Sequence, residues 1–476
     1  MSDPSIGKST AGIHGAWSNR LTFILAATGS AVGLGNIWKF PYIAGENGGG
    51  AFVLVYLVCI LAVGIPVMIA EVLMGRHGRS SPIHTVAKLS KEAKAHPAWT
   101  FIGGMGVVAG FLILSYYSVV AGWALAYVPK MMVGIFNGID GAGSGEVFEG
   151  LLASPGTLLG WHSLFMLLTM FVVVAGVTKG LGVAVRTFMP LLFVLLLIVL
   201  GFSMAQGDFE QAFSYLFSFD ASRLSFESVL IALGHAFFTL SLGMGAIMAY
   251  GAYTSADTPI GTSVLTIAFL DTAVALVAGM TIFPMVFSSP DIVPSEGPGL
   301  LFISLPVAFG NMPAGMLFGT LFFGLVSLAA WSSSISLIEP AVAWVVEKTE
   351  MTRLKAGVIC GVLCWLLGIG SLLSFNHWSD AKLLGKFTFF DFSDFLTANV
   401  MLPVGGVLIA IFVGFVMNQK IVRDELGADS GLIFKAWRFV LRWVSTIAVS
   451  IIFIEGISGV FFDASPFSSL WNMLLG

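Results

Sequence analysis

The chain alternates long apolar runs with short polar connections along its whole length. A membrane-spanning helix needs about 20 consecutive, mainly apolar residues. Candidate spans cover residues 18–42, 48–74, 99–128, 160–178, 183–205, 226–251, 262–287, 314–346, 355–375, 393–418 and 436–460. The pattern predicts an all-α polytopic membrane protein, with a short cytoplasmic N-terminal segment at 1–16, a membrane domain of eleven helices at 17–460 and an external tail at 461–476.

Composition supports this prediction. Hydrophobic residues make up 57% of the chain and charged residues 10%, whereas a soluble domain carries about 25% charged residues. The polar stretch from Met1 to Ala16 lacks the pattern of a removable signal peptide, so the first apolar run is predicted to be a retained helix. With 22 Lys and Arg in 476 residues and a net charge of −4, the composition argues against nucleic acid as a partner. No nucleophile–base pair or metal cluster has a credible spacing, which argues against an enzyme.

The positive charges predict an orientation, because cytoplasmic loops of membrane proteins carry an excess of Lys and Arg. With the N-terminus inside, all of the 22 Lys and Arg fall on cytoplasmic segments or helix ends except Lys39, Lys130, Arg223, Lys382 and Lys386. We therefore predict a multi-pass protein of the cell (inner) membrane with a cytoplasmic N-terminus and an external C-terminus.

Two predicted helices contain clustered glycines beside hydroxyl and amide side chains: GSAVGLGN at 29–36 in the first and TLSLGMG at 239–245 in the sixth. Each Gly weakens a helix by roughly 1 kcal/mol, and broken backbone survives in lipid only inside protein or beside a cavity. Helices one and six each open a five-helix unit, and paired interruptions of this kind mark a midplane site in secondary transporters. The alternative is close helix packing through small residues.

Several motifs together resemble the neurotransmitter:sodium symporter family, in particular its bacterial LeuT-like amino-acid transporters with eleven helices. They are WSNRL at 17–21, GSAVGLGNIWKFPY at 29–42, ENGGGAF at 46–52, FFTLSLGMG at 237–245, SSS at 332–334 and EP at 339–340. The resemblance implies a LeuT-like fold: two inverted five-helix repeats plus one extra C-terminal helix, with helices 1 and 6 unwound at the midplane.

The resemblance also implies two sodium sites made of oxygen ligands, which hard cations require. The first would use Ala31, Asn36, Thr239 and Asp271 together with the substrate carboxylate. The second would use the carbonyls of Gly29, Val32 and Ala329 and the side chains of Ser332 and Ser333.

Asp271 lies in an otherwise apolar helix, and an ionisable residue inside a span is a functional-site hypothesis by default. The alternative is a protonated carboxyl bonded to a neighbouring helix. Many relatives carry an amide at this position, and chloride-dependent relatives carry a serine one turn further on, where this chain has Ala275. We therefore expect Na⁺ at two sites and no chloride.

A helix N-terminus attracts carboxylates, and the break at Gly33, Leu34 and Gly35 would create one. By resemblance, Tyr117 would donate to the substrate carboxylate. Amine-transporting relatives carry Asp in place of Gly33, so an amino acid is expected. The complete predicted substrate set is Ser30, Ala31, Gly33, Leu34, Gly35, Ile113, Tyr117, Phe238, Thr239, Ser241, Met244, Ser333 and Leu337. Its apolar lining disfavours a charged substrate side chain, but aliphatic, aromatic and small side chains all stay open.

The resemblance places gates on both sides of this pocket. Lys39 and Asp394 match the external charged gate, and His235 is expected near them, as a titrating or a packing group. Glu347 and Tyr253 match the internal gate, where His14 replaces the usual Arg. The partner of Glu347 stays open between His14, Lys8 and Arg20. Glu71 is expected to support the broken sixth helix by accepting hydrogen bonds.

These inferences predict sodium-coupled symport of a neutral, hydrophobic L-amino acid by alternating access, with two Na⁺ per substrate and no need for chloride. A proton-coupled amino-acid carrier using Asp271 and a non-concentrating amino-acid sensor are the alternatives. The expected partners are the small neutral amino acid and the lipid bilayer, and the oligomeric state stays open.

Overall fold

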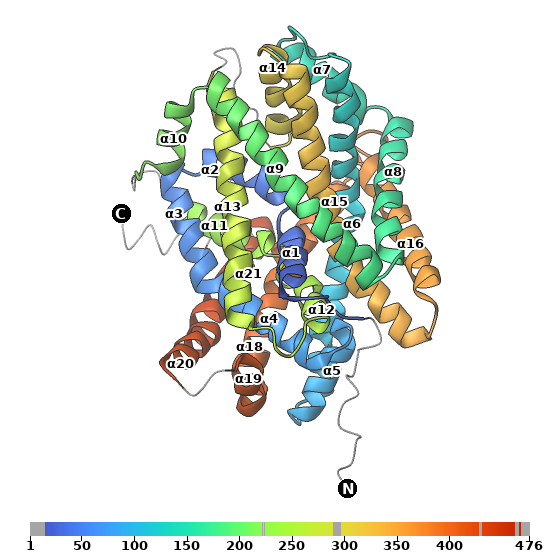
Figure 1. Cartoon of the computed structure of the whole chain (residues 1–476), viewed down its shortest axis with the longest axis vertical. Coiled ribbons are helices and arrows are strands. Elements are labelled where there is room, and N and C mark those ends of the chain that lie inside the picture. Colours follow the sequence, from blue (N-terminus) through green and yellow to red (C-terminus); the bar gives the residue numbers. More distant parts are fainter. Residues whose placement is uncertain are drawn as a thin grey trace.

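The computed structural model describes residues 15–220, 222, 224–288, 297–427, 431–461 and 466–467. Apart from one isolated β-bridge between Leu383 and Phe387, the regular structure in these ranges is helical. The helices form one bundle, with their long axes running between two ends of the molecule (Figure 1).

Nine continuous segments of the described chain are long and apolar enough to cross a membrane. They are Gly50–Gly78 (α3, η2, α4), Pro97–Met132 (η3, α6), Pro155–Val174 (α8), Val177–Gln206 (η4, α9), Ile260–Phe287 (α13), Gly315–Thr349 (α15), Arg353–Leu373 (α16), Phe389–Val416 (α17, η7, α18, η8) and Leu432–Phe461 (α20, η9, α21). Each coincides with a predicted span to within a few residues.

The two remaining predicted spans, the first and the sixth, are both broken. The first consists of α1 (Arg20–Ala31) and η1–α2 (Gly35–Glu46), bent by 54° at the break. The sixth consists of α11 (Phe226–Thr239) and α12 (Ala246–Ala252). Each of the two five-span units therefore opens with an interrupted helix.

Short helices at the two ends of the bundle were not predicted, because the search was for segments long enough to span a membrane. Figure 1 shows α7, α10 and α14 at one end, and α5 and α19 at the other end together with α20 (Leu432–Phe439), which begins the last span. The bounds of those not yet given are Pro82–Glu92 (α5), Gly141–Leu152 (α7), Phe209–Phe217 (α10), Leu300–Ser304 and Leu305–Gly310 (η6, α14) and Gln419–Leu426 (α19). Local polar caps define several of them; Asp208, for example, accepts a hydrogen bond from the Gln211 amide at the start of α10.

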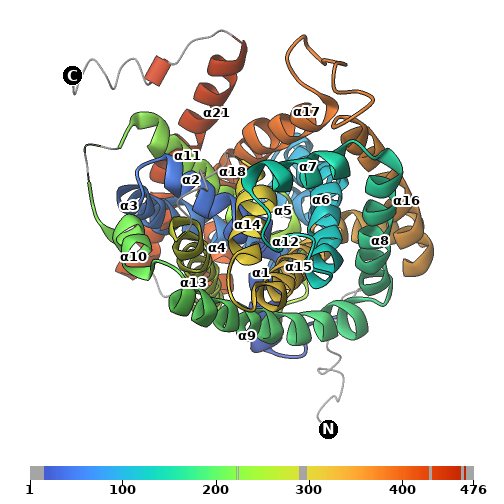
Figure 2. The same ribbon diagram turned by 90° about the horizontal axis from the view of Figure 1, so that it is seen from above.

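The broken helices lie in the middle of the bundle. In the view from above, α12 lies beside α6 and α15, α1 lies beside α12 and α15, and the helices α3, α9, α8, α16 and α21 lie around them (Figure 2). Large apolar side chains on the outer helices are exposed, including Leu167, Phe171 and Phe269. The carboxylates of Asp271, Glu71 and Glu339 are fully buried. Apolar groups outside and polar groups inside are the arrangement expected of a protein in lipid.

Candidate substrate and ion site

The first break exposes backbone oxygens inside the protein. Helix α1 ends at Ala31, and the chain turns extended at Val32 (φ −71°, ψ 107°) before helical structure resumes at Gly35. The last carbonyls of a helix have no partner within the helix. The carbonyls of Gly29 and Val32 therefore face the centre of the bundle instead of continuing the ladder.

The second break depends on glycines in the left-handed region. Gly243 has φ +78°, and a Cβ there would lie 2.6 Å from the Leu402 carbonyl oxygen. Any larger residue at 243 would therefore clash with backbone. The freed Gly243 amide donates to Glu71 Oε1 over 2.6 Å, so Glu71 supplies the partner that the broken helix lacks.

Near these breaks, three side chains from different helices meet. The Asn36 amide nitrogen lies 2.7 Å from Asp271 Oδ1 and 3.0 Å from Thr239 Oγ1. The Thr239 hydroxyl lies 3.1 Å from Asp271 Oδ2. All three side chains are at most 1% exposed. The side-chain members of the predicted first sodium site thus form a single dry cluster of oxygen-bearing groups, the chemistry that a hard cation needs.

A second group of oxygens lies where α1 ends against α15. The Ser333 hydroxyl is 2.9 Å from the Val32 carbonyl and 3.2 Å from the Gly29 carbonyl. Ser332 Oγ, one residue earlier, is 2.9 Å from the Ala329 carbonyl. Ser333 therefore joins the end of α1 to α15, while the bond between Ser332 and Ala329 lies within α15. Among the described residues, no group of three His, Cys, Asp or Glu side chains is arranged to hold a metal ion.

A small cavity of about 30 Å³ lies beside the first cluster. Every residue of the predicted substrate set lines this cavity, and no other described residue does. The lining residues are Ser30, Ala31, Gly33, Leu34, Gly35, Ile113, Tyr117, Phe238, Thr239, Ser241, Met244, Ser333 and Leu337. The Tyr117 hydroxyl accepts a hydrogen bond from the Leu34 amide over 3.3 Å. A Cβ at Gly33 would lie 2.6 Å from Ser333 Oγ and 2.9 Å from the Tyr117 hydroxyl, so a larger residue there would require these side chains to move.

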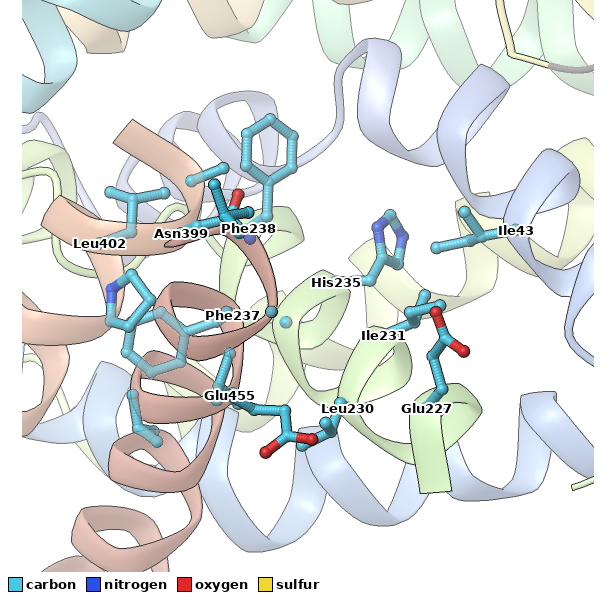
Figure 3. A pocket seen from close by; sticks show the side chains of 18 of the residues that line it. Ile43, Glu227, Leu230, Ile231, His235, Phe237, Phe238, Asn399, Leu402 and Glu455 are labelled. Atoms are coloured by element: carbon cyan, nitrogen blue, oxygen red, sulfur yellow. The ribbon is translucent and has the colours of Figure 1, made fainter. Parts of the chain in front are cut away.

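A larger cavity of about 500 Å³ lies next to α2 (Figure 3). Phe238 lines both this cavity and the small one. The Lys39 ammonium lies 4.9 Å from the centre of the Phe238 ring. Lys39 and Asp394 are both described and half-buried, and no ion pair joins them. The buried His235 ring stacks on Phe40, with ring centres 5.9 Å apart.

Aromatic and charged residues form a chain of contacts at the start of α1. The Trp17 indole donates to the Tyr250 carbonyl over 2.9 Å, and the Trp17 amide donates to the Tyr253 carbonyl. The Tyr253 hydroxyl donates to Glu339 Oε1 over 2.7 Å. Both terminal nitrogens of Arg353 also donate to Glu339, one of them over 3.0 Å. The start of α1 is thereby tied to a buried ion pair.

Glu347 has partners that the sequence did not suggest. The Ser81 amide donates to one carboxylate oxygen over 2.7 Å, and His84 Nδ1 lies 2.5 Å from the other. Arg20 instead donates to Ser263 and Thr262, over 3.0 Å in each case. His14 and Lys8 lie outside the described residues.

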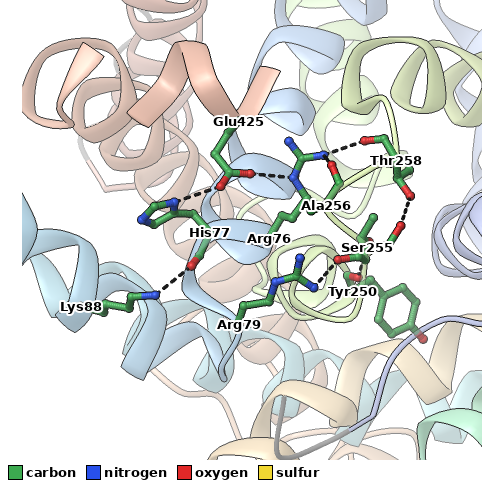
Figure 4. Close-up of polar contacts among 10 residues, drawn as sticks. Arg76, His77, Arg79, Lys88, Tyr250, Ser255, Ala256, Thr258 and Glu425 are labelled. Carbon is green, nitrogen blue, oxygen red and sulfur yellow. Dashed lines mark hydrogen bonds and ion pairs between the residues drawn. The ribbon is translucent and has the colours of Figure 1, made fainter. Parts of the chain in front are cut away.

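A further network holds the chain that follows α12 (Figure 4). Arg76, near the end of α4, donates to the Thr258 carbonyl over 2.6 Å and to Glu425 of α19 over 2.6 Å. Arg79 donates to the Thr254 carbonyl. Burial of Glu425 opposes its ionisation, but hydrogen bonds and positive charge from His77 and Arg76 outweigh this effect and lower its pKa. The charged carboxylate therefore links α4 to α19.

The sequence analysis missed these supporting contacts, although some signals were present. Glu339 was noted only as part of a motif, and the RHGR sequence at 76–79 is an unusual cluster of charge at the end of a span. Neither pattern identifies its partners, because those lie 14 to 349 residues away.

Paired helix breaks at the centre of a membrane bundle, with buried oxygens on both, are typical of secondary transporters. The model of the sodium:neurotransmitter symporter family matches residues 14–135 and 151–469. The chain belongs to this family of sodium-dependent symporters, which are transporters and not enzymes.

Individual relatives agree with this assignment. The sodium-dependent transporter YhdH of Bacillus subtilis is 37% identical over 92% of this chain and 97% of its own. A sodium-dependent transporter of Haemophilus influenzae is 31% identical over 93% of this chain and 98% of its own. The crystal structure of MhsT in complex with L-phenylalanine has a TM-score of 0.85 and 42% identity, covering 92% of this chain and 99% of that one. The predicted LeuT-like fold is thereby confirmed.

Proposed function

We propose that this symporter carries a neutral, hydrophobic L-amino acid together with two Na⁺, without chloride, by alternating access. The observation that carries the proposal is the cavity shared by both helix breaks, with Asn36, Thr239 and Asp271 beside it. The substrate carboxylate would complete the first ion site, and the broken helix one would attract it. MhsT, whose structure was solved with L-phenylalanine, has a similar fold, which supports an amino-acid substrate.

The cavity walls restrict the substrate class. Gly33 faces Ser333 and Tyr117 so closely that the Asp of amine carriers would displace their hydroxyls. The absence of this Asp favours a substrate that brings its own carboxylate. Ile113, Met244 and Leu337 are apolar and buried, and a charged substrate side chain among them would have no counter-charge. A bulky side chain needs more than 30 Å³, so Phe238 and the flexible Met244 would have to shift on binding.

Two ions supply ample driving force. Each Na⁺ gains about 2.3 kcal/mol per 100 mV on entry, and a tenfold gradient adds roughly 1.4 kcal/mol. Two ions together provide about 7 kcal/mol, enough to concentrate a zwitterion by around five decades. The proposed orientation has the N-terminus in the cytoplasm and the C-terminus outside, with the Lys39 side of the pocket facing out.

A sodium-dependent binding screen on purified protein tests the substrate. We expect neutral hydrophobic L-amino acids to bind in Na⁺ buffer and to bind at least 10-fold more weakly when K⁺ replaces Na⁺. Concentrative uptake into proteoliposomes should then require an inward sodium gradient. Uptake driven by a pH gradient in sodium-free buffer would support a proton-coupled carrier instead. Sodium-dependent binding without accumulation would support a sensor.

Chloride independence is tested separately. Ala275 is fully buried one turn along α13 from Asp271 and offers no hydroxyl to an anion, while an ionised Asp271 would supply the negative charge itself. Replacing chloride by gluconate on both sides of the vesicle is expected to change the uptake rate by less than about twofold. A loss of uptake that chloride restores in a saturable manner would contradict this prediction.

A further inference from the structure

A basic pocket lies away from the transport site, between α19 and the start of the last span. It is a hollow of about 380 Å³ lined by four cationic side chains: Arg423 from α19, and Lys435, Arg438 and Arg442 from α20 and η9. None of the described residues that line it is acidic. Four positive charges around one hollow repel one another, so an anion bound among them is favoured.

The hydrogen bonds of these side chains leave donors available. Arg438 Nη2 donates to the Gly414 carbonyl over 3.2 Å, and Arg442 Nε donates to the same oxygen. The Arg442 guanidinium also lies 4.7 Å from the centre of the Phe415 ring. Arg423 Nε is buried and has no hydrogen-bond partner in the described chain. Guanidinium groups match the oxygens of a phosphate with paired hydrogen bonds.

The rim of the pocket is apolar and faces outward. Phe439 and Trp443 line the pocket with 59% and 51% of their surfaces exposed. At the start of α20, Leu432 and Ile433 are more than four-fifths exposed. Aromatic residues beside basic ones are typical of the membrane–water interface. A ligand with both a phosphate and acyl chains fits this combination, because the charge would enter the pocket while the chains lie along the span.

The pocket is at the end of the bundle that carries α5 and α19, which is the end we propose to be cytoplasmic (Figure 1). Anionic phospholipids give the cytoplasmic leaflet its negative surface potential, and basic pockets between helices on that side bind their headgroups. We propose that the pocket formed by Arg423, Lys435, Arg438 and Arg442 binds the phosphate headgroup of an anionic phospholipid.

Lipid binding to the purified full-length protein, followed by native mass spectrometry or by microscale thermophoresis in detergent, tests the proposal. Phosphatidylglycerol is expected to bind at least 10-fold more tightly than phosphatidylcholine, and its affinity should fall as salt is raised. Equal affinity for the two lipids in the wild-type protein would overturn the proposal. Inorganic phosphate is tested as a third ligand, in competition with phosphatidylglycerol. If phosphate displaces the lipid fully at equal concentration, the pocket binds a free anion and the lipid assignment is wrong.

The variant Arg423→Gln/Lys435→Gln removes two charges without touching the bonds to Gly414. We expect it to weaken phosphatidylglycerol binding about 30-fold, roughly fivefold for each lost cation. The matched control, Lys91→Gln/Lys94→Gln, removes two exposed cations from α5 and its C-terminal end, at the same end of the bundle. Equal weakening in both variants would show a diffuse charge effect and overturn the proposal. Sodium-dependent amino-acid binding by each variant checks that it is folded. If a variant does not fold, the comparison of phosphatidylglycerol with phosphatidylcholine in the wild-type protein still tests the proposal.

Discussion

Replacing Asp271 with alanine is expected to lower sodium-stimulated uptake at least about 100-fold. Asp271 is fully buried, and its carboxylate lies 2.7 Å from the Asn36 amide and 3.1 Å from the Thr239 hydroxyl. If a desolvated Na⁺ binds in this cluster, removing its charged ligand leaves a buried cation without compensation, which costs about 3–5 kcal/mol. The measurement is initial uptake into proteoliposomes as a function of sodium concentration.

Two further variants make this result specific. Asp271→Asn keeps an oxygen ligand without the charge, so it should retain more sodium-stimulated uptake than the alanine variant. Asp380→Ala removes an exposed carboxylate far along the chain and should leave uptake unchanged. If uptake and its sodium dependence survive in Asp271→Ala, Asp271 is not a sodium ligand. Elution of the variant as a monodisperse peak in detergent excludes misfolding as the cause of a loss.

Replacing Arg353 with methionine is expected to have the largest effect on stability. Glu339 is fully buried, and Arg353 donates two hydrogen bonds to it. Without the guanidinium, a carboxylate stays unpaired inside the bundle, at a cost of about 3–5 kcal/mol. We expect a drop of about 10 °C in the melting temperature of the purified protein. Uptake should also fall, because Tyr253 bonds to the same carboxylate and its carbonyl holds Trp17.

The matched control is Arg186→Met, which removes an exposed guanidinium whose one hydrogen bond within the described residues goes to the Gly182 carbonyl, one turn earlier in α9. It should shift the melting temperature by less than about 2 °C. Adding Glu339→Gln to Arg353→Met removes the unpaired charge and should recover more than half of the lost stability. If the double variant is as unstable as Arg353→Met alone, the loss came from packing and not from the buried charge.

The sequence predicted the spans and the positions of both breaks because these are local properties. Apolar runs of sufficient length must cross lipid, and the glycine clusters at 29–36 and 239–245 cannot hold a regular helix cheaply. The family resemblance then named the residues of the central cavity, and the same residues line one cavity in the structure. Their roles toward substrate and sodium stay predictions.

Contacts between distant segments were beyond the reach of the sequence. The pairing of Glu347 with Ser81 and His84 joins positions more than 260 residues apart. Arg20 was one of the three candidate partners of Glu347, but it donates hydrogen bonds to Thr262 and Ser263. No local pattern distinguishes these possibilities, because the choice depends on which helix ends meet in the folded bundle.

The sequence by itself determined that this protein lies in a lipid bilayer and where its helices break. Both follow from properties of single helices, namely the length of an apolar run and its glycine content. What only the tertiary structure decided is which oxygens face one another across the breaks, which carboxylates receive a cation, and where four cations surround one hollow. Those features depend on the packing of helices against each other, and electrostatic and hydrogen-bond energies change strongly over a few ångströms.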